Sequence, residues 1–230
     1  PSRSDRAHLH QPRRAASTRQ QRAEAENKAL RAQMNPHFVF NCMNTIEYYI
    51  LSNQADKASA FLQNFSLLVR NILENSQYDL IPLTQELDTL KLYIELEKER
   101  AEGAFSYDIM LDETVPNKCQ LPPLILQPFV ENAILHGLRH KTNEKGQLSI
   151  KIWQADKSLW VEIQDNGVGR KAAAEIHQKQ QRKKQSLGMK VTADRISALP
   201  TTEGQPRGAF KVEDIFPTGT RVTIQLPLYL

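Results

Sequence analysis

Apolar residues recur every three or four positions through the first hundred residues, the spacing of one face of an α-helix. The pattern predicts one long helix over residues 18–51 and a second over residues 61–73, separated by a turn in SNQADKAS, residues 52–59. A third helix is predicted to open at Thr84 and to end near Arg100. Two long helices with a short connection predict an antiparallel hairpin, and two such hairpins would bury their apolar faces as a dimeric four-helix bundle.

Beyond residue 100 the apolar period changes to 2, which indicates β-strands. Strands are predicted at residues 105–111, 148–152, 159–163 and 222–226. Between the first two lies the apolar stretch LPPLILQPFVENAILHGL, where Pro122 and Pro123 favour a helix start. The fold class is therefore predicted to be α+β, with a helical hairpin followed by one sheet that helices cover.

Charge and composition lead to expectations about the surroundings of the chain in the cell. Residues 1–31 hold eight Arg or Lys against three Asp or Glu, although the whole chain has a net charge of +4. Residues 1–17 therefore predict a basic flexible tail or a juxtamembrane segment facing anionic lipid. No apolar run is long enough to span a bilayer and the chain starts with Pro1, so we expect a fragment whose membrane anchor lies upstream. Cys42 and Cys119 are predicted to be buried thiols in a reducing compartment.

The motif DNGVG, residues 165–169, directly follows a predicted strand. Asp-Asn-Gly is a common hairpin turn, but the segment that follows is polar and helix-prone rather than strand-like. The turn also suits a purine, because Asp165 can accept a hydrogen bond from an exocyclic amine while Gly167 and Gly169 let the backbone approach a flat ligand. Both interpretations are open at this point.

The motif VENAILHG, residues 130–137, would place Asn132 and His136 one helical turn apart, with Glu131 beside them. Polar groups in so apolar a helix predict either a structural hydrogen-bond network or a functional site. In the functional interpretation, the amide oxygen of Asn132 is a ligand to a phosphate-bound Mg2+ ion.

Two weaker motifs follow. SLGMK, residues 186–190, places Gly188 before an amphipathic helix, where it is either a flexible joint or the point at which backbone amides meet a phosphate. That helix is expected to carry Val191, Ile196 and Leu199. Thr220, in the dipeptide GT, opens the last strand and is uninformative alone.

The order of these motifs resembles the N, G1, G2 and G3 boxes of the GHKL superfamily, which contains gyrase, Hsp90, MutL and the histidine kinases. The resemblance covers residues 105–230 and implies a GHKL, or Bergerat, α/β sandwich with ATP and Mg2+ as cofactors. It implies a lid from Arg170 to Gly188. The residues expected to line the nucleotide site are Asn132, His136, Asp165, Gly167, Gly169, Gly188 and Thr220.

Three further stretches narrow the resemblance. QMNPHFVFN (residues 33–41), LIPLTQEL (residues 80–87) and LQPFVENAILHG (residues 126–137) together resemble the LytS/YehU-type sensor histidine kinases, whose phosphoacceptor motif is the same Asn-Pro-His-Phe stretch. This resemblance implies ATP-dependent autophosphorylation of His37 and transfer to an aspartate of a response regulator, by family a LytTR-type DNA-binding regulator. It implies a homodimer that forms the cytoplasmic portion of an inner-membrane protein, without direct nucleic-acid binding.

The residues around His37 fit this role. Pro36 has no N–H and clashes with the preceding turn, so the carbonyl of Ala32 loses its helical partner and the helix bends locally. A neutral imidazole is an available nucleophile at cellular pH, whereas a lysine amine is almost wholly protonated. Asn35 and Asn41 flank the histidine with groups able to orient its ring.

Some positions depart from the commoner patterns of these families. Pro128 stands four residues before Asn132, where gyrase-like ATPases carry a catalytic glutamate, which favours phosphotransfer over ATP hydrolysis. Phe38 follows His37 where many kinases place an acid, so the general base is not identified and Glu131 is a candidate. Ser186 replaces the first glycine of the usual G2 pattern.

The expected domains are a tail (1–17), a helical dimerisation and phosphoacceptor domain (18–100) and an ATP-binding catalytic domain (101–230). A sensor histidine kinase is the function that these observations favour. The alternatives are a GHKL-fold ATPase or clamp, which would leave the NPHF helix without a purpose, and a catalytically degenerate dimeric scaffold. A nucleic-acid binder would need interleaved aromatic residues or a reading module, which the basic segment lacks.

Overall fold

The structure, a computed structural model, describes residues 36–141, 144–170 and 189–230. The chain divides into two compact units, residues 1–54 and residues 55–230. The first unit contributes helix α2 (Pro36–Leu51), which ends where the long helix was predicted to end. The predicted tail and the predicted helical residues before Pro36 lie outside the described residues, and the pairing of hairpins in a dimer stays a prediction.

The second unit begins with helix α3 (Ala55–Asn75), strand β1 (Ile81–Pro82) and helix α4 (Leu83–Arg100). The predicted turn of eight residues was too long, because α3 already starts at Ala55 and carries Asp56 in its first turn, where an acidic side chain complements the helix dipole. Helix α4 opens one residue earlier than expected, and Pro82 rather than Thr84 occupies its N-cap position.

The sheet of this unit has five strands in the order β2-β4-β5-β7-β6. Strands β2 (Phe105–Leu111) and β4 (Gly146–Ala155) are parallel, whereas β4, β5 (Ser158–Asp165), β7 (Thr220–Pro227) and β6 (Ala209–Asp214) pair antiparallel. The four predicted strands are confirmed. Strand β6 was not predicted, because it is an edge strand without fully buried positions and its apolar alternation is weak. Strand β3 (Gln120–Leu121) pairs with β1 and is too short to show a period.

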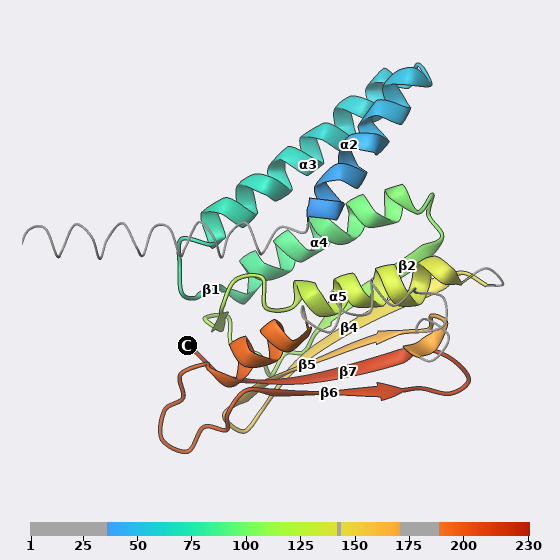
Figure 1. Cartoon of the computed structure of the whole chain (residues 1–230). Helices are drawn as coiled ribbons and strands as arrows, with labels where there is room; N and C mark the ends of the chain where they lie inside the picture. Colours follow the sequence, from blue (N-terminus) through green and yellow to red (C-terminus); the bar gives the residue numbers. More distant parts are fainter. Residues whose placement is uncertain (1–35, 142–143, 171–188) are drawn as a thin grey trace, which may run out of the picture. The chain divides into compact units, whose positions relative to one another are not determined.

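Alternate residues of β4, β5 and β7 are buried on one face of the sheet, as period 2 predicts. Helices α4, α5 (Gln127–Asn132) and residues 189–197 lie on that face (Figure 1). In the contact between layers, the Phe129 ring of α5 meets the Phe210 ring of β6 edge-on at 5.0 Å. The predicted α+β sandwich of one sheet covered by helices is confirmed.

Two details of the covering helices differ from expectation. Helix α5 starts at Gln127 with Pro128 in its first turn, not at the Pro122-Pro123 pair. It continues into the π-helix η1 (Ala133–Gly137) and the 3-10 helix η2 (Leu138–His140). Residues 189–197 are helical as expected, but Val191 is 58% exposed while Ile196 is 1% exposed.

Candidate functional site

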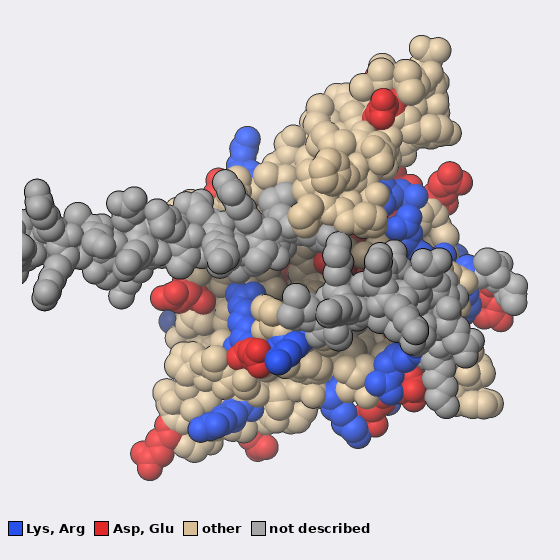
Figure 2. Space-filling view, viewed as in Figure 1, with Lys and Arg blue, Asp and Glu red and all other residues tan. Residues whose placement is uncertain are grey.

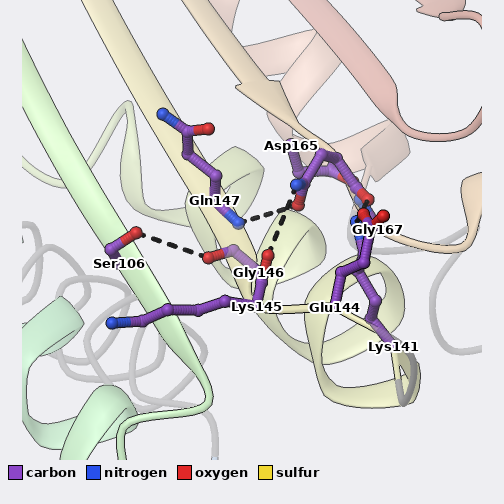
Figure 3. Close-up of polar contacts among 9 residues, drawn as sticks. Ser106, Lys141, Glu144, Lys145, Gly146, Gln147, Asp165 and Gly167 are labelled. Carbon is purple, nitrogen blue, oxygen red and sulfur yellow. Dashed lines mark hydrogen bonds and ion pairs between the residues drawn. The ribbon is translucent and has the colours of Figure 1, made fainter.

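Asp165, the last residue of β5, is 4% exposed and lies at the junction of three segments. Its Oδ1 accepts a hydrogen bond from the backbone N–H of Gly167 at 2.9 Å (Figure 3). The hairpin interpretation of this turn is wrong, because β5 already pairs with β4 and β7 and no strand follows it directly in the chain. Thr220 lies opposite Asp165 in the register of β7, so the structure brings these two predicted site residues together.

Glycines make this junction possible. A Cβ on Gly137 would come within 2.6 Å of Asp165 Oδ1, and a Cβ on Gly167 would overlap the backbone of Gly137. A Cβ on Gly219 would overlap the carbonyl oxygen of Asp165. Gly167 is therefore required by the packing of the protein's own backbone, a cause that the sequence did not reveal, and its approach to a bound base stays a prediction. Gly169 has φ of 78°, which favours glycine for a different reason.

Burial raises the pKa of the Asp165 carboxyl to about 6, while hydrogen bonds from the N–H groups of Gly167 and Thr220 and the charge of Lys141 oppose this rise. Lys141 also fixes the turn itself, because its Nζ donates to the carbonyl of Asn166 at 2.8 Å. The side-chain oxygen of Asn166 in turn accepts the N–H of Gln147 at 2.7 Å (Figure 3). Asp165 thus projects from a turn whose backbone is held at several points.

Asn132 ends α5, and its Nδ2 donates to the Sδ of Met189 at 2.9 Å. The expected relation between Asn132 and His136 was drawn for an α-helix, and it is wrong in detail because the intervening residues form the π-helix η1. Glu131, Asn132 and His136 are all half-buried. Met189 was missed as a partner, and only its place directly after the glycine of SLGMK hinted at it.

The two groups of predicted residues are connected through η1. Gly137, the last residue of η1, packs against Asp165 and Gly167, while Asn132 directly precedes the first residue of η1. The amide nitrogen of Asn132 is engaged by sulfur, so its oxygen is the atom that remains for a cation. Mg2+ is commonly held by one or two protein oxygens together with substrate phosphates. Within the part of the chain that the structure describes there is no cluster of three acidic, His or Cys ligands.

His37 lies in the first turn of α2 and is exposed. The Nδ2 of Asn41, one turn further along, lies 3.0 Å from Nδ1 of the ring. The predicted flanking role of Asn41 therefore has a geometric basis. Asn35 and the backbone contact of Ala32 lie outside the described residues, as do Gly188, Ser186 and nearly all of the predicted lid.

The chain matches two family models. Residues 25–105 match the histidine kinase family, and residues 122–230 match the family of histidine kinase-, DNA gyrase B- and HSP90-like ATPases. Each model matches less than half of the chain, and the chain is thus similar to histidine kinases in both of its parts. The second match also supports ATP binding by the domain that carries Asp165 and Asn132.

The relatives of this chain include LytS-type sensor proteins, which confirms the resemblance read from the sequence. It is 34% identical to the sensor protein LytS of Bacillus subtilis over 64% of this chain and 24% of the relative. It is 28% identical to LytS of Enterococcus faecalis over 89% of this chain and 34% of the relative. It is 33% identical to the sensor histidine kinase BtsS of Escherichia coli over 62% of this chain and 25% of the relative. The chain spans about a quarter to a third of the length of these curated relatives.

The surface of the described residues has mixed charge. Figure 2 shows Lys and Arg side chains interspersed with Asp and Glu on the face drawn there. No helix in residues 36–141, 144–170 or 189–230 combines the length and the apolar character needed to cross a membrane. Cys42 and Cys119 are buried and are not joined in a disulfide, and burial raises the pKa of Cys119 to about 11.

Proposed function

We propose that this chain is the catalytic portion of a sensor histidine kinase, in which the γ-phosphoryl group of ATP is transferred to His37 and then to an aspartate of a response regulator. The observation that carries the proposal is the exposed imidazole of His37, oriented by Asn41 in the first turn of α2. A histidine whose role is to support a core would be expected inside that core, and this one is not.

The chemistry at His37 requires one ring nitrogen with a free lone pair. An amide can present either its oxygen or its nitrogen to Nδ1. When the oxygen of Asn41 accepts a hydrogen bond from Nδ1–H, the lone pair of the ring lies on Nε2, which attacks the γ-phosphorus. A bond between nitrogen and phosphorus then forms as the bond to the bridging oxygen breaks, and ADP leaves with that electron pair. Glu131 remains our candidate for receiving the ring proton.

The nucleotide is held by residues at the end of β5 and on α5. The ionised carboxylate of Asp165 accepts a hydrogen bond from the exocyclic amine of adenine, beside the turn that contains Gly167 and Gly169. Asn132 would hold Mg2+ through its amide oxygen, and the ion would supply charge neutralisation at the phosphates. His136, Thr220 and Gly188 complete the site in this proposal. Phosphoryl transfer depends mainly on such positioning and charge stabilisation.

The partners belong to the same proposal. The similarity to the histidine kinase family supports a homodimer and a response regulator as partners. A LytTR-type regulator and a membrane anchor in an upstream region are further parts of this proposal. The described chain would then be the cytoplasmic portion of an inner-membrane sensor.

The decisive experiment is incubation of the full chain with γ-labelled ATP and Mg2+, followed by acid and alkali treatment of the labelled protein. We expect a label that is lost in acid and survives base, as phosphohistidine does, and no label in His37→Gln. Label that persists in His37→Gln, or that resists acid, would show that another residue is the acceptor. Asn132→Ala is expected to abolish labelling, and His140→Gln serves as a control substitution of a histidine outside the proposed site.

A further inference from the structure

Two charged side chains, Glu86 and Arg195, hold residues 123–126, the segment that leads into α5. Glu86 of α4 is 1% exposed, and its carboxylate accepts hydrogen bonds from the backbone N–H groups of Leu124 at 2.7 Å and Leu126 at 3.2 Å. Arg195 donates to the backbone carbonyls of Pro123 and Leu124. Glu86 therefore accepts hydrogen bonds from backbone N–H groups of this short segment, and Arg195 donates hydrogen bonds to its carbonyl groups.

The charges of the pair are matched to this backbone segment. Burial raises the pKa of Glu86 to about 7, and the opposing influences are the N–H groups of Leu124, Leu126 and Ile125 together with the charge of Arg195. Burial likewise lowers the pKa of Arg195, and the charge of Glu86 opposes this. A carboxylate and a guanidinium in such a place are expensive to bury unless both are hydrogen-bonded. Their presence indicates that the position of the segment between them matters.

The segment also has a strained backbone that needs outside support. Leu124 has φ of 56°, in the left-handed region that side-chain-bearing residues rarely adopt. Such a conformation persists only when its surroundings fix it. Here both the N–H and the carbonyl of Leu124 are hydrogen-bonded to the charged pair.

The segment is connected through α5 to the proposed nucleotide site. Leu126 is the N-cap residue of α5, and the carboxylate of Glu86 accepts its backbone N–H, as the acid of a capping box does. The other end of α5 is Asn132, whose amide contacts Met189 in the same helix that carries Arg195. Displacement of the segment would therefore shift α5 and Asn132 along with it.

We propose that Glu86 and Arg195 are positioning residues of the nucleotide site, which fix residues 123–126 and thereby the amide of Asn132 at the far end of α5. This inference rests on the proposed function in one respect, that Asn132 belongs to the nucleotide site. The pair acts through α5 and not by contact with the nucleotide.

The test measures the Kd of the full chain for a fluorescent, non-hydrolysable ATP analogue in the presence of Mg2+, well below the Tm of each variant. Glu86→Gln replaces one acceptor oxygen by an NH2 group that faces a backbone N–H. We expect its Kd to rise roughly tenfold, because a buried acceptor group is lost. Arg195→Lys keeps the charge but loses the planar fork, and its Kd is expected to rise roughly threefold. Asp88→Asn, on an exposed position of the same helix α4, is the matched control and should leave the Kd unchanged.

The double variant distinguishes a shared role from two separate ones. Because both side chains hold the same segment, its loss of affinity should be no larger than that of Glu86→Gln alone, whereas additive losses would overturn the proposal. A lowered Tm with unchanged Kd in the folded variants would also overturn it, since the pair would then be merely structural. If Glu86→Gln does not fold, Arg195→Lys decides alone. Failure of the unaltered chain to bind the analogue would instead refute the proposed function.

Discussion

The surroundings of His37 and of Asp165 are constructed in opposite ways. His37 is exposed, and its orienting contact comes from Asn41, four residues along the same helix. Asp165 is buried, and its surroundings come from β5, β7 and η1, with glycines at each close approach. In the proposed function, His37 meets both the nucleotide and a response regulator, and its surroundings can be specified within one helix. Asp165 would bind one ligand, and its carboxylate needs a preorganised environment. Substitutions near His37 should therefore change reactivity, and substitutions near Asp165 should change stability and binding together.

The largest effect on stability is expected for Gly167→Ala. Its methyl group would overlap the backbone of Gly137, which cannot move as a flexible side chain would. We expect the free energy of unfolding to fall by about 3 kcal/mol, at the upper end of ordinary overpacking, with loss of ATP binding. Urea unfolding of the full chain measures the change.

Gly103→Ala is the matched control for Gly167→Ala. Gly103 has φ of 74° but open space around its Cβ position, so the substitution should cost only about 1 kcal/mol of backbone strain and leave ATP binding intact. Equal costs in the two variants would contradict the close contact that we describe between Gly167 and Gly137.

The second effect is a dependence of stability on pH that Asp165 causes. Its folded-state pKa, about 6, lies above the ordinary value of 3.8, so the folded protein binds the proton more tightly than the unfolded chain. The resulting stabilisation is complete below pH 3.8 and is lost as pH rises through 6. Relative to Asp165→Asn, the unaltered chain should lose about 2.4 kcal/mol of unfolding free energy between pH 4 and pH 7. A difference that stays constant with pH would show that the buried carboxyl is not perturbed.

The same contrast explains what could be predicted from the sequence. Helices α2, α3 and α4 and four strands follow from apolar period, and the His37 site follows from residues within one helical turn, because these signals are local. The contact of Gly137 with Gly167 joins residues 30 positions apart, and the contact of Asn132 with Met189 spans 57 positions. No period or spacing encodes such contacts. The residues of the motif containing Asp165 left two interpretations open. Only the order of the motifs along the chain, which resembles that of a known family, favoured the nucleotide site.

Local rules also failed where tertiary contacts overrode them. Pro122 and Pro123 favour a helix start, yet α5 begins only at Gln127, after the segment that Glu86 and Arg195 hold. The apolar character of Val191 predicted burial, yet it is exposed in the structure. For α5, the contacts of Glu86 and Arg195 with the preceding segment join residues far apart in the chain. Nothing in the structure explains the exposure of Val191.

A third and smaller effect is expected for Arg170→Ala, directly after Gly169. Its guanidinium forms a two-bond ion pair with Asp214, at 2.9 Å and 3.0 Å, but the two side chains are 53% and 44% exposed. Solvent screening limits such a pair to about 0.5 kcal/mol. Urea unfolding at low and high salt should show this small loss shrinking as salt rises. A loss comparable to that of Gly167→Ala would mean that charge, and not packing, holds this turn.

The smallest effect on stability is expected on the other side of the comparison, at Asn41. A contact between exposed side chains four residues apart in a helix contributes roughly 0.2–0.5 kcal/mol, so Asn41→Ala should unfold almost like the unaltered chain. Its rate of labelling by γ-labelled ATP should nevertheless fall about fivefold, since a hydrogen bond worth about 1 kcal/mol no longer selects the reactive tautomer of His37. Asn41→Asp keeps an acceptor for Nδ1–H and removes the donor, so it should label at least as fast as the unaltered chain. Slow labelling of Asn41→Asp would instead mean that the amide donates to Nδ1, and that the nitrogen which attacks is not Nε2.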